Sequence, residues 1–176
     1  MAKINLVKIN EVKIADADLS AGVMPSTFTT LGDIKEGNCN IDFPEKSTTA
    51  EYSEQTQQPY RFRDSTVINK ISLELVTEDA ETLSSITGYD YSGGKMTIVG
   101  NPKAKNKYVV ISGENIDGDV VTVSAYNAHV TSSWSGNMGA NQETVGWSVT
   151  FSMLQDASDA KALGDITVAT PAPAMG

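Results

Sequence analysis

Apolar and polar residues alternate strictly in the segment from Thr144 to Leu154. One parity carries Val145, Trp147, Val149, Phe151 and Met153, and the other carries Thr, Gly and Ser. Because successive side chains of a strand point to opposite faces, this pattern predicts a long strand with one buried face. The second face holds only small uncharged side chains, mostly hydroxyls. Such a strand is more typical of a scaffold than of a catalyst.

Two long hairpins are predicted around such alternating segments. In the first, Asn38–Phe43 and Ser47–Ser53 precede Asp64–Thr77, where Ile71, Leu73 and Leu75 share one parity. The polar stretch between these arms, EQTQQPYRFR at 54–63, would form a tip of about ten residues. Hairpin loops usually have about two to five residues, so a longer tip suggests a function. In the second hairpin, Val120–Trp134 pairs with Thr144–Leu154 across SGNMGANQE.

One helix is predicted near 78–87. Thr77 can cap its first turn, and Glu78, Asp79 and Glu81 favour the positive end of the helix dipole. Leu83 and Ile86 form an apolar pair, and Gly88 ends the helix. A short helix of this kind needs a sheet to pack against.

The remaining signals complete a mainly β fold. Lys3–Ile14 alternates imperfectly, short strands are expected at Lys95–Val99 and Tyr108–Ser112, and Asp117-Gly118-Asp119 is a turn signal. We therefore predict a β-sandwich or barrel with two long hairpins and one flanking helix. The expected organisation is an N-terminal strand and arm over 1–37, a domain over 38–155, and a C-terminal tail over 156–176 that ends in Pro and Ala.

Composition excludes several function classes. The chain has 176 residues and a formal net charge of −9, and its sequence pI is about 4.5. This charge disfavours tight nucleic-acid binding, which needs clustered Lys and Arg. Cys39 is the only cysteine, so no intramolecular disulfide can form, and a buried thiol without a function is expected. No secretory signal or membrane-spanning run is recognised, so synthesis in the cytoplasm is expected.

The sequence contains few residues that could act in catalysis. His129 is the only histidine, and its place in a predicted strand suggests an inward or interfacial side chain rather than a general base. No nucleophile elbow, phosphate-binding loop or dinucleotide-binding motif occurs. Carboxylates cluster at Asp16–Asp18 and Glu114–Asp119, but neither cluster has EF-hand spacing, and a turn is the simpler reading. We expect no enzyme activity, no metal and no cofactor.

Exposed aromatic residues could instead bind sugars. We interpret these residues more readily as part of a core edge or of a subunit contact. They are Tyr52, Tyr60, Phe62, Tyr89 and Tyr91. Near them, the basic residues Arg61, Arg63 and Lys70 lie beside Glu51 and Glu54. We interpret this cluster as a mixed surface of ion pairs, each of small energetic value.

The layout resembles the tail tube (major tail) proteins of long-tailed bacteriophages. The resemblance covers about Gly37 to Gln155 and includes GNCNIDF…TTAEYSE, SLELVTEDAETLSSITG and VSAYNAHVTSS. It rests on architecture, with two long hairpins flanking one helix, and not on a sharp motif. It implies a β-sandwich whose long hairpins join with those of neighbouring copies in hexameric rings. The inner wall of each ring is then a continuous barrel, and stacked rings conduct DNA.

This resemblance assigns roles to two sets of residues. The lumen-facing set is Ser72, Glu74, Thr144, Ser148, Thr150 and Ser152, where hydroxyls and the acidic charge would keep DNA from sticking. The set reaching adjacent rings is Glu54, Gln55, Gln57, Gln58, Tyr60 and Arg61, together with the N-terminal region and the C-terminal tail. The implied partners are other copies of the chain, a tape-measure protein and a tail terminator. DNA would pass without specific binding, and the protein would reside in the virion tail after assembly in the host cytoplasm, without a membrane.

Three alternatives stay open. A monomeric immunoglobulin-like or carbohydrate-binding sandwich would bind glycans through Tyr60 or Phe62. A secretion-system tube protein would form the same kind of ring. An enzyme that uses His129 is the third alternative.

Overall fold

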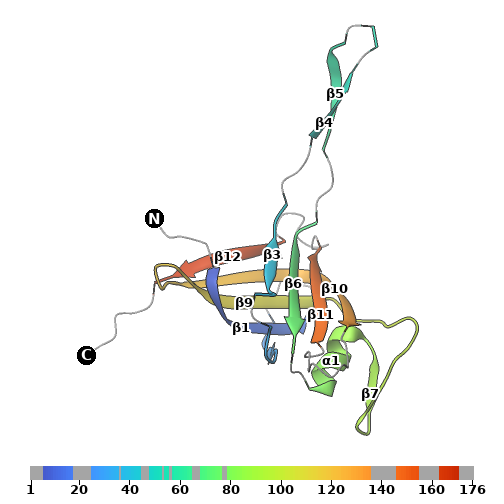
Figure 1. Ribbon diagram of the computed structural model, residues 1–176, viewed down its shortest axis with the longest axis vertical. Coiled ribbons are helices and arrows are strands. Elements are labelled where there is room, and N and C mark those ends of the chain that lie inside the picture. The colour runs from blue at the N-terminus through green and yellow to red at the C-terminus, as the bar shows by residue number, and fades with distance from the viewer. Residues whose placement is uncertain are drawn as a thin grey trace, which may run out of the picture.

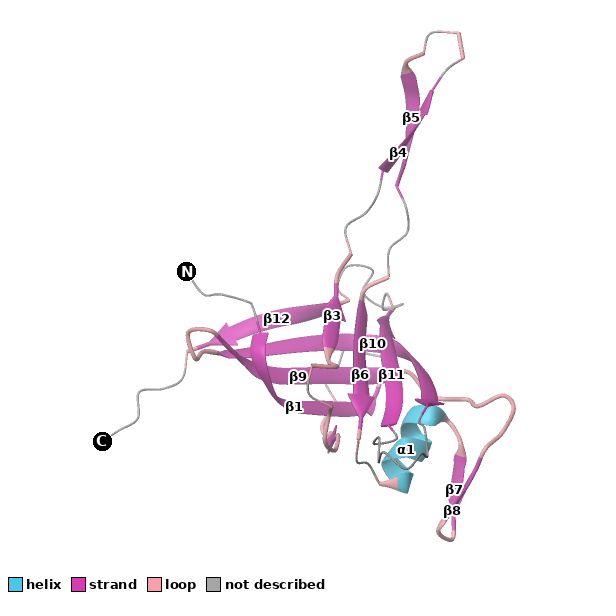
Figure 2. Ribbon diagram, viewed as in Figure 1, coloured by secondary structure: helices cyan, strands magenta, loops and turns pink. Residues whose placement is uncertain are grey.

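The fold of this chain, seen in a computed structural model, is mainly β with one helix among the residues that the structure describes. Those residues are 6–17, 25–35, 37–44, 48–52, 54–55, 57–64, 68–76, 79–135, 146–154 and 163–170. Figure 2 shows the strands crossing in the body of the molecule and one hairpin reaching far beyond it. The mainly β fold with a single helix, predicted from the alternation, is confirmed.

Most strands belong to one eight-stranded antiparallel sheet, in the order β2-β1-β9-β10-β11-β6-β3 with β12 also on β10. Its strands are β1 (Leu6–Asp16), β2 (Thr29–Thr30), β3 (Asn40–Asp42), β6 (Lys70–Leu75), β9 (Lys107–Asn115), β10 (Val120–Ser135), β11 (Gly146–Met153) and β12 (Gly164–Ala169). Two small hairpins complete the β structure: β4 (Thr48–Tyr52) with β5 (Pro59–Asp64), and β7 (Asp90–Ser92) with β8 (Lys95–Thr97).

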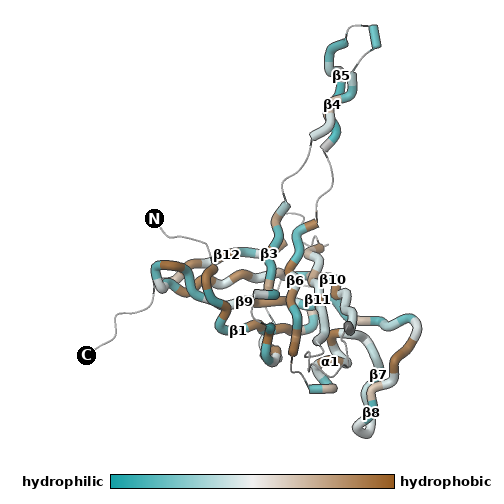
Figure 3. The backbone as a smooth tube through the Cα atoms, viewed as in Figure 1, coloured by the Kyte–Doolittle hydropathy of each residue, from teal (hydrophilic) through white to brown (hydrophobic). Residues whose placement is uncertain are grey.

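Strand β10 joins two crossing layers. Its first half, Val120–Ala125, pairs with both β9 and β12, and its second half, Ala128–Ser135, pairs with β11. In Figure 1, β3, β6 and β11 run steeply across β1, β9 and β12. Between the layers lies one hydrophobic core, to which β1, β6, β9, β10 and β11 all contribute. In Figure 3 the apolar colour is accordingly concentrated in these strands.

Alternation along β11 is confirmed. Val149, Phe151 and Met153 are buried, whereas Ser148 is exposed and Thr150 is half-buried. On β6 the same holds, with Ile71, Leu73 and Leu75 in the core. The second long hairpin, β10–β11, also forms as predicted, pairing Ala128 with Met153 and Ser135 with Gly146.

The first long hairpin forms in two parts that share one register. Near the body, β3 pairs with β6, from Asn40↔Ser72 to Asp42↔Lys70, and farther out β4 pairs with β5, from Thr48↔Asp64. The segment from β3 to β4 (43–47) has as many residues as the segment from β5 to β6 (65–69). The pairing register of β3 with β6 is therefore the same as that of β4 with β5. The tip is shorter than predicted, because Pro59–Asp64 is strand β5 and only residues 53–58 separate Tyr52 from Pro59.

The helix α1 (Ala80–Thr87) forms where expected but has a different cap. Asp79, not Thr77, is the N-cap: its carboxylate accepts hydrogen bonds from the backbone N–H groups of Glu81 and Thr82. A carboxylate satisfies two free amides and favours the helix dipole, which a threonine hydroxyl at position 77 would do less well. Gly88 ends the helix at φ 75°, as predicted, and a side chain there would collide with the backbone of 103–104.

Strands on both sides of the expected 38–155 domain belong to the same sheet as that domain. The predicted N-terminal strand forms as β1, which pairs with β9 from Leu6 to Asp16. Strand β12 lies within the expected tail but pairs with β10 from Val120↔Ala169 to Ala125↔Gly164. Tyr126 Oη donates to Asp165 Oδ2 at 2.9 Å, and this hydrogen bond raises the pKa of Tyr126 to about 12. The sheet thus extends beyond Gln155 through β12, a largely exposed strand that pairs with β10.

Candidate functional site

One layer of the sheet presents a polar face made of three cross-strand rows. The strand register places opposite one another Ser133, Ser148 and Glu74, then Thr131, Thr150, Ser72 and Asn40, then His129, Ser152, Lys70 and Asp42. These eleven residues, the polar face, all have the parity opposite to the core side chains of β6, β10 and β11. Direct cross-strand neighbours on one face lie about 5 Å apart, so the rows form a continuous surface.

The structure brings together five of the six residues expected to line a lumen. Ser72, Glu74, Ser148, Thr150 and Ser152 lie on adjacent strands β6 and β11, whereas Thr144 lies outside the described residues. Ser72 Oγ and Thr150 Oγ1 are 3.3 Å apart and share a hydrogen bond. Sequence reasoning did not include Thr131, Ser133, Asn40 and Asp42 in this set. The sequence shows the parity of these residues within their own strands. It does not show that β10 pairs with β11 and β3 with β6 in the registers that place them on the same face.

Charge on the polar face is balanced rather than acidic. Glu74 accepts hydrogen bonds from Lys35 Nζ at 3.2 Å and from Asn38 Nδ2 at 2.5 Å. At the other end of the strand, Lys70 pairs in register with Asp42. Each carboxylate therefore has a cation beside it, so this face is not uniformly acidic.

His129 lies on the polar face, not inside. Its neighbours Ala128 and Val130 are buried, and the alternation of β10 places His129 on the exposed side opposite Ser152. The inward alternative is thus wrong, and the interfacial alternative stays a prediction. The reason is a register shift between Ala125 and Ala128 in the pairing of β10 with β9, where two buried residues, Asn127 and Ala128, follow one another.

Strands β4 and β5 form an arm that stands clear of the body (Figure 1). Ala50 pairs with Phe62, so these two residues lie on one face of the arm, and Tyr52 lies nearby beyond a bulge. Tyr52 and Phe62 are 62% and 64% exposed. In this part of the chain, the residues expected to reach adjacent rings divide into a tip (Glu54, Gln55, Gln57, Gln58) and strand β5 (Tyr60, Arg61).

The second face of the arm is charged. Arg61 pairs in register with Glu51, and Arg63 Nε lies 2.6 Å from Glu51 Oε1. This confirms an ion pair in the mixed cluster. Arg61 is exposed and makes no salt bridge within the described part of the chain. The arm is therefore an amphipathic ribbon without a core of its own, and isolated two-stranded hairpins are at best marginally stable in water.

At the opposite end of the same layer, three aromatic residues form what we call the aromatic patch: Tyr89, Trp134 and Trp147. Trp134 and Trp147 are cross-strand partners with ring centroids 6.3 Å apart, and Tyr89 meets Trp147 edge-on at 6.3 Å. Trp134 is 52% exposed. Tyr89, considered from the sequence as a sugar platform, thus packs on a tryptophan. Trp134 and Trp147 both have the parity of the buried residues on their strands, and this feature of the sequence could have predicted that they lie on the same face.

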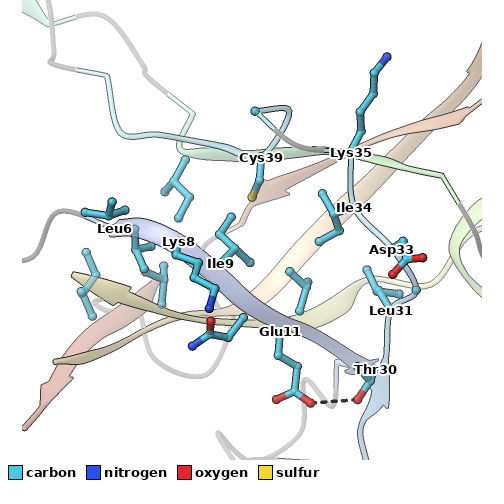
Figure 4. Close-up of a pocket in the computed structure, with 18 of the residues that line it drawn as sticks. Leu6, Lys8, Ile9, Glu11, Thr30, Leu31, Asp33, Ile34, Lys35 and Cys39 are labelled. Atoms are coloured by element: carbon cyan, nitrogen blue, oxygen red, sulfur yellow. Dashed lines mark hydrogen bonds between the residues drawn. The ribbon is translucent and has the colours of Figure 1, made fainter. Parts of the chain in front are cut away.

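A groove of about 1060 Å³ lies between β1 and the segment that leads into β3 (Figure 4). Its wall is largely apolar, with Leu6, Ile9, Ile34, Cys39 and Ile41 among its residues. Over Leu6–Glu11 strand β1 pairs only with β9 among the described strands, so its edge borders the groove. Lys8, Glu11, Asp33 and Lys35 also line the groove, and two of them are in ion pairs, Glu11 with Lys13 and Lys35 with Glu74.

Cys39 in this groove is expected to be unreactive. Burial raises the pKa of its thiol to about 11, so the thiol stays protonated at neutral pH, and the thiolate is the reactive form. Its rate of alkylation by iodoacetamide at about pH 7.5 should be at least about tenfold below that of the same protein in denaturant. Equal rates in the native and denatured states would show that the thiol is accessible and its pKa ordinary.

The described carboxylates that could suggest calcium make contacts within the chain, and Asp18 lies outside the described residues. Asn115 Oδ1 accepts hydrogen bonds from the backbone N–H groups of Asp117 and Asp119, which fixes the predicted turn, and Gly118 there has φ 83°. Asp16 contacts Lys105 and Lys107. Within the described ranges, no group of three or more His, Cys, Asp or Glu side chains is arranged to hold a metal ion.

Comparison of the chain with known protein families found no matching family, and comparison with curated proteins found no similar sequence. Among the described residues, no helix has the length and apolar character needed to cross a membrane.

Proposed function

We propose that this protein is a structural component that self-assembles into stacked hexameric rings and forms the tail tube of a long-tailed bacteriophage. The observation that carries the proposal is the arm. It extends the β3–β6 hairpin in one register, leaves the body, and leaves Tyr52 and Phe62 largely exposed. Exposed apolar surface of this kind is typical of an interaction site.

Unpaired strand edges support lateral association. The polar layer ends on one side at β10, where His129–Ser135 pairs only with β11 among the described strands. On the other side it ends at β3, whose Asn40–Asp42 pairs only with β6. Open edges invite pairing with another chain. Joining the β10 edge of one copy to the β3 edge of the next would continue the polar face around a ring, and a closed ring leaves no edge.

A lumen formed by the polar face would suit the passage of DNA. Hydroxyls of Ser and Thr dominate its centre, and its charges occur as Lys35 with Glu74 and Lys70 with Asp42. Tight binding of phosphates requires clustered cations that release counterions, and no such cluster lies on this face. On this proposal the protein would reside in the virion tail, with tape-measure and terminator proteins as partners.

Electron microscopy of the purified protein tests the proposal directly. At about 10 mg/mL and at salt concentrations from about 0.1 M to about 1 M, which span weak to strong screening, rings or tubes with a central channel are expected. Sedimentation velocity on the same samples should show species larger than a monomer. A monomer under all these conditions would overturn the proposal and favour the glycan-binding sandwich, and rings that never stack would argue against a tube.

A further inference from the structure

The groove lies on the core side of β3, opposite to the polar face. In β3 and the residues that flank it, every second residue lines the groove: Lys35, Gly37, Cys39, Ile41 and Phe43. Asn40 and Asp42, which have the other parity, belong to the polar face. In Figure 4 the side chain of Cys39 points across the groove toward Ile9 of β1. A strand added to the open edge of β3 would therefore direct every second side chain toward this groove.

Trp134 lies on the other open edge of the same layer. Its strand segment, His129–Ser135 of β10, pairs only with β11 among the described strands. Trp134 has the parity of the buried Val130, yet it is 52% exposed. Its ring lies beside that of Trp147, with centroids 6.3 Å apart. A half-exposed tryptophan at an open strand edge is typical of the residues that dominate binding at protein interfaces.

The strand directions allow these two edges to join. Along the layer, β10, β11, β6 and β3 alternate in direction, because each neighbouring pair is antiparallel. In a ring with rotational symmetry, β10 of one copy therefore runs antiparallel to β3 of the next copy. The register must set polar residues opposite polar residues, because a slip of one residue would move every side chain to the other face.

The register that continues the three polar rows at one level places Trp134 opposite Gly37. In that register Ser133 meets Asn38, and Thr131 meets Asn40. Gly37 has no side chain, and no atom lies within 4 Å of the position that a Cβ would take. A shift of two residues in either direction would set Trp134 opposite Lys35 or Cys39, which also line the groove.

We infer that Trp134 of one copy fills the groove of the next copy in the ring. This inference rests on the proposed function and names the residue and the cavity that join neighbouring copies, which that function leaves open. The groove, of about 1060 Å³, has room for an indole ring and offers it apolar walls that include Ile34 and Ile41. Seating the ring there removes apolar surface of both copies from water, which is the main favourable contribution in protein association.

Photo-cross-linking of the full-length chain tests this contact. Benzoylphenylalanine placed at position 134 keeps an aromatic side chain there and bonds to nearby C–H groups on irradiation. In assembled rings it should link to residues 34–43 of a second copy, as identified by mass spectrometry of mixed isotopically light and heavy protein. The same group at position 133 is the matched control. Because Ser133 lies on the polar face, no link to residues 34–43 is expected from there.

Substitutions measure the contribution of the contact. Trp134→Ala should raise the protein concentration needed for ring formation by at least about tenfold, since truncation of a tryptophan anchor removes much of the binding energy. Cys39→Phe, which places a ring inside the groove, should also weaken ring formation. Ser133→Ala should assemble like the wild type. Circular dichroism checks that each variant is folded, and the cross-linking result decides if one is not.

Fluorescence provides a further readout. The chain has two tryptophans, so in Trp147→Phe protein Trp134 is the only one. Its emission should shift to shorter wavelength when rings form. Rings in which position 134 links elsewhere, or in which this emission does not shift, would show that another segment covers the groove, and the inference would fail while the proposed function stands. A wild type that never forms rings would overturn both.

Discussion

Replacing Phe151 with alanine is expected to lower the free energy of unfolding by about 3–5 kcal/mol. Phe151 is fully buried on β11 and pairs with Val130 on one side and Ile71 on the other. Both partners belong to the core between the two layers. The substitution removes a large apolar side chain and leaves a cavity that rigid strands on both sides cannot fill. Urea denaturation followed by circular dichroism would measure the loss.

Ser152→Ala is the matched control on the next residue of the same strand. Ser152 lies half-buried on the polar face and contributes nothing to the core. Its replacement should change the free energy of unfolding by no more than about 0.5 kcal/mol. Equal effects of the two substitutions would contradict the assignment of a core face and a polar face to β11.

The second large effect is expected at Lys107, whose side chain is only 2% exposed. Its ammonium group lies 2.5 Å from Asp16 Oδ1 and 2.6 Å from Ser85 Oγ, so it links β1, β9 and α1. Asp16→Ala would leave a buried cation without its counterion and should cost about 2 kcal/mol, after allowance for the screening of the 52% exposed Asp16. Lys107→Met removes the buried charge and keeps an apolar stem, so it should cost less than about 1 kcal/mol. Thermal unfolding of both variants at neutral pH measures this asymmetry, and a larger loss for Lys107→Met would contradict it.

Low pH should remove the stabilisation that the Asp16–Lys107 ion pair provides. The hydrogen bond from Lys107, followed by that from Lys105, lowers the pKa of Asp16 in the folded protein, against the opposing effect of burial. A carboxylate with a lowered folded pKa stabilises the protein above its unfolded pKa of about 3.9 and loses this contribution as the pH falls through the folded pKa. The stability difference between the wild type and Asp16→Ala should therefore be full at neutral pH and shrink below about pH 4. A constant difference down to about pH 2 would show that Asp16 acts by packing and not by charge.

Much of the candidate site could be predicted from alternation. The parity of Ser72 and Glu74 against Ile71 and Leu73 is enough to separate a polar from a buried face, because the strand period of two leaves no other choice. His129 shows where this reasoning stops. A local shift in the pairing of β10 with β9 changed which parity faced the core, and nothing in the residues around His129 marks that shift.

Local patterning by itself determined the elements of this protein: alternating strands, one capped helix and two hairpins follow from side-chain period, capping residues and turn residues. Tertiary structure decided how the elements meet. Only the pairing of distant strands gave Glu74 its neighbours Lys35 and Asn38, added β12 to the sheet, and set Trp134 beside Trp147 at the end opposite the arm. These contacts join residues far apart in the chain, and their energy depends on register and burial, which no local segment of sequence specifies.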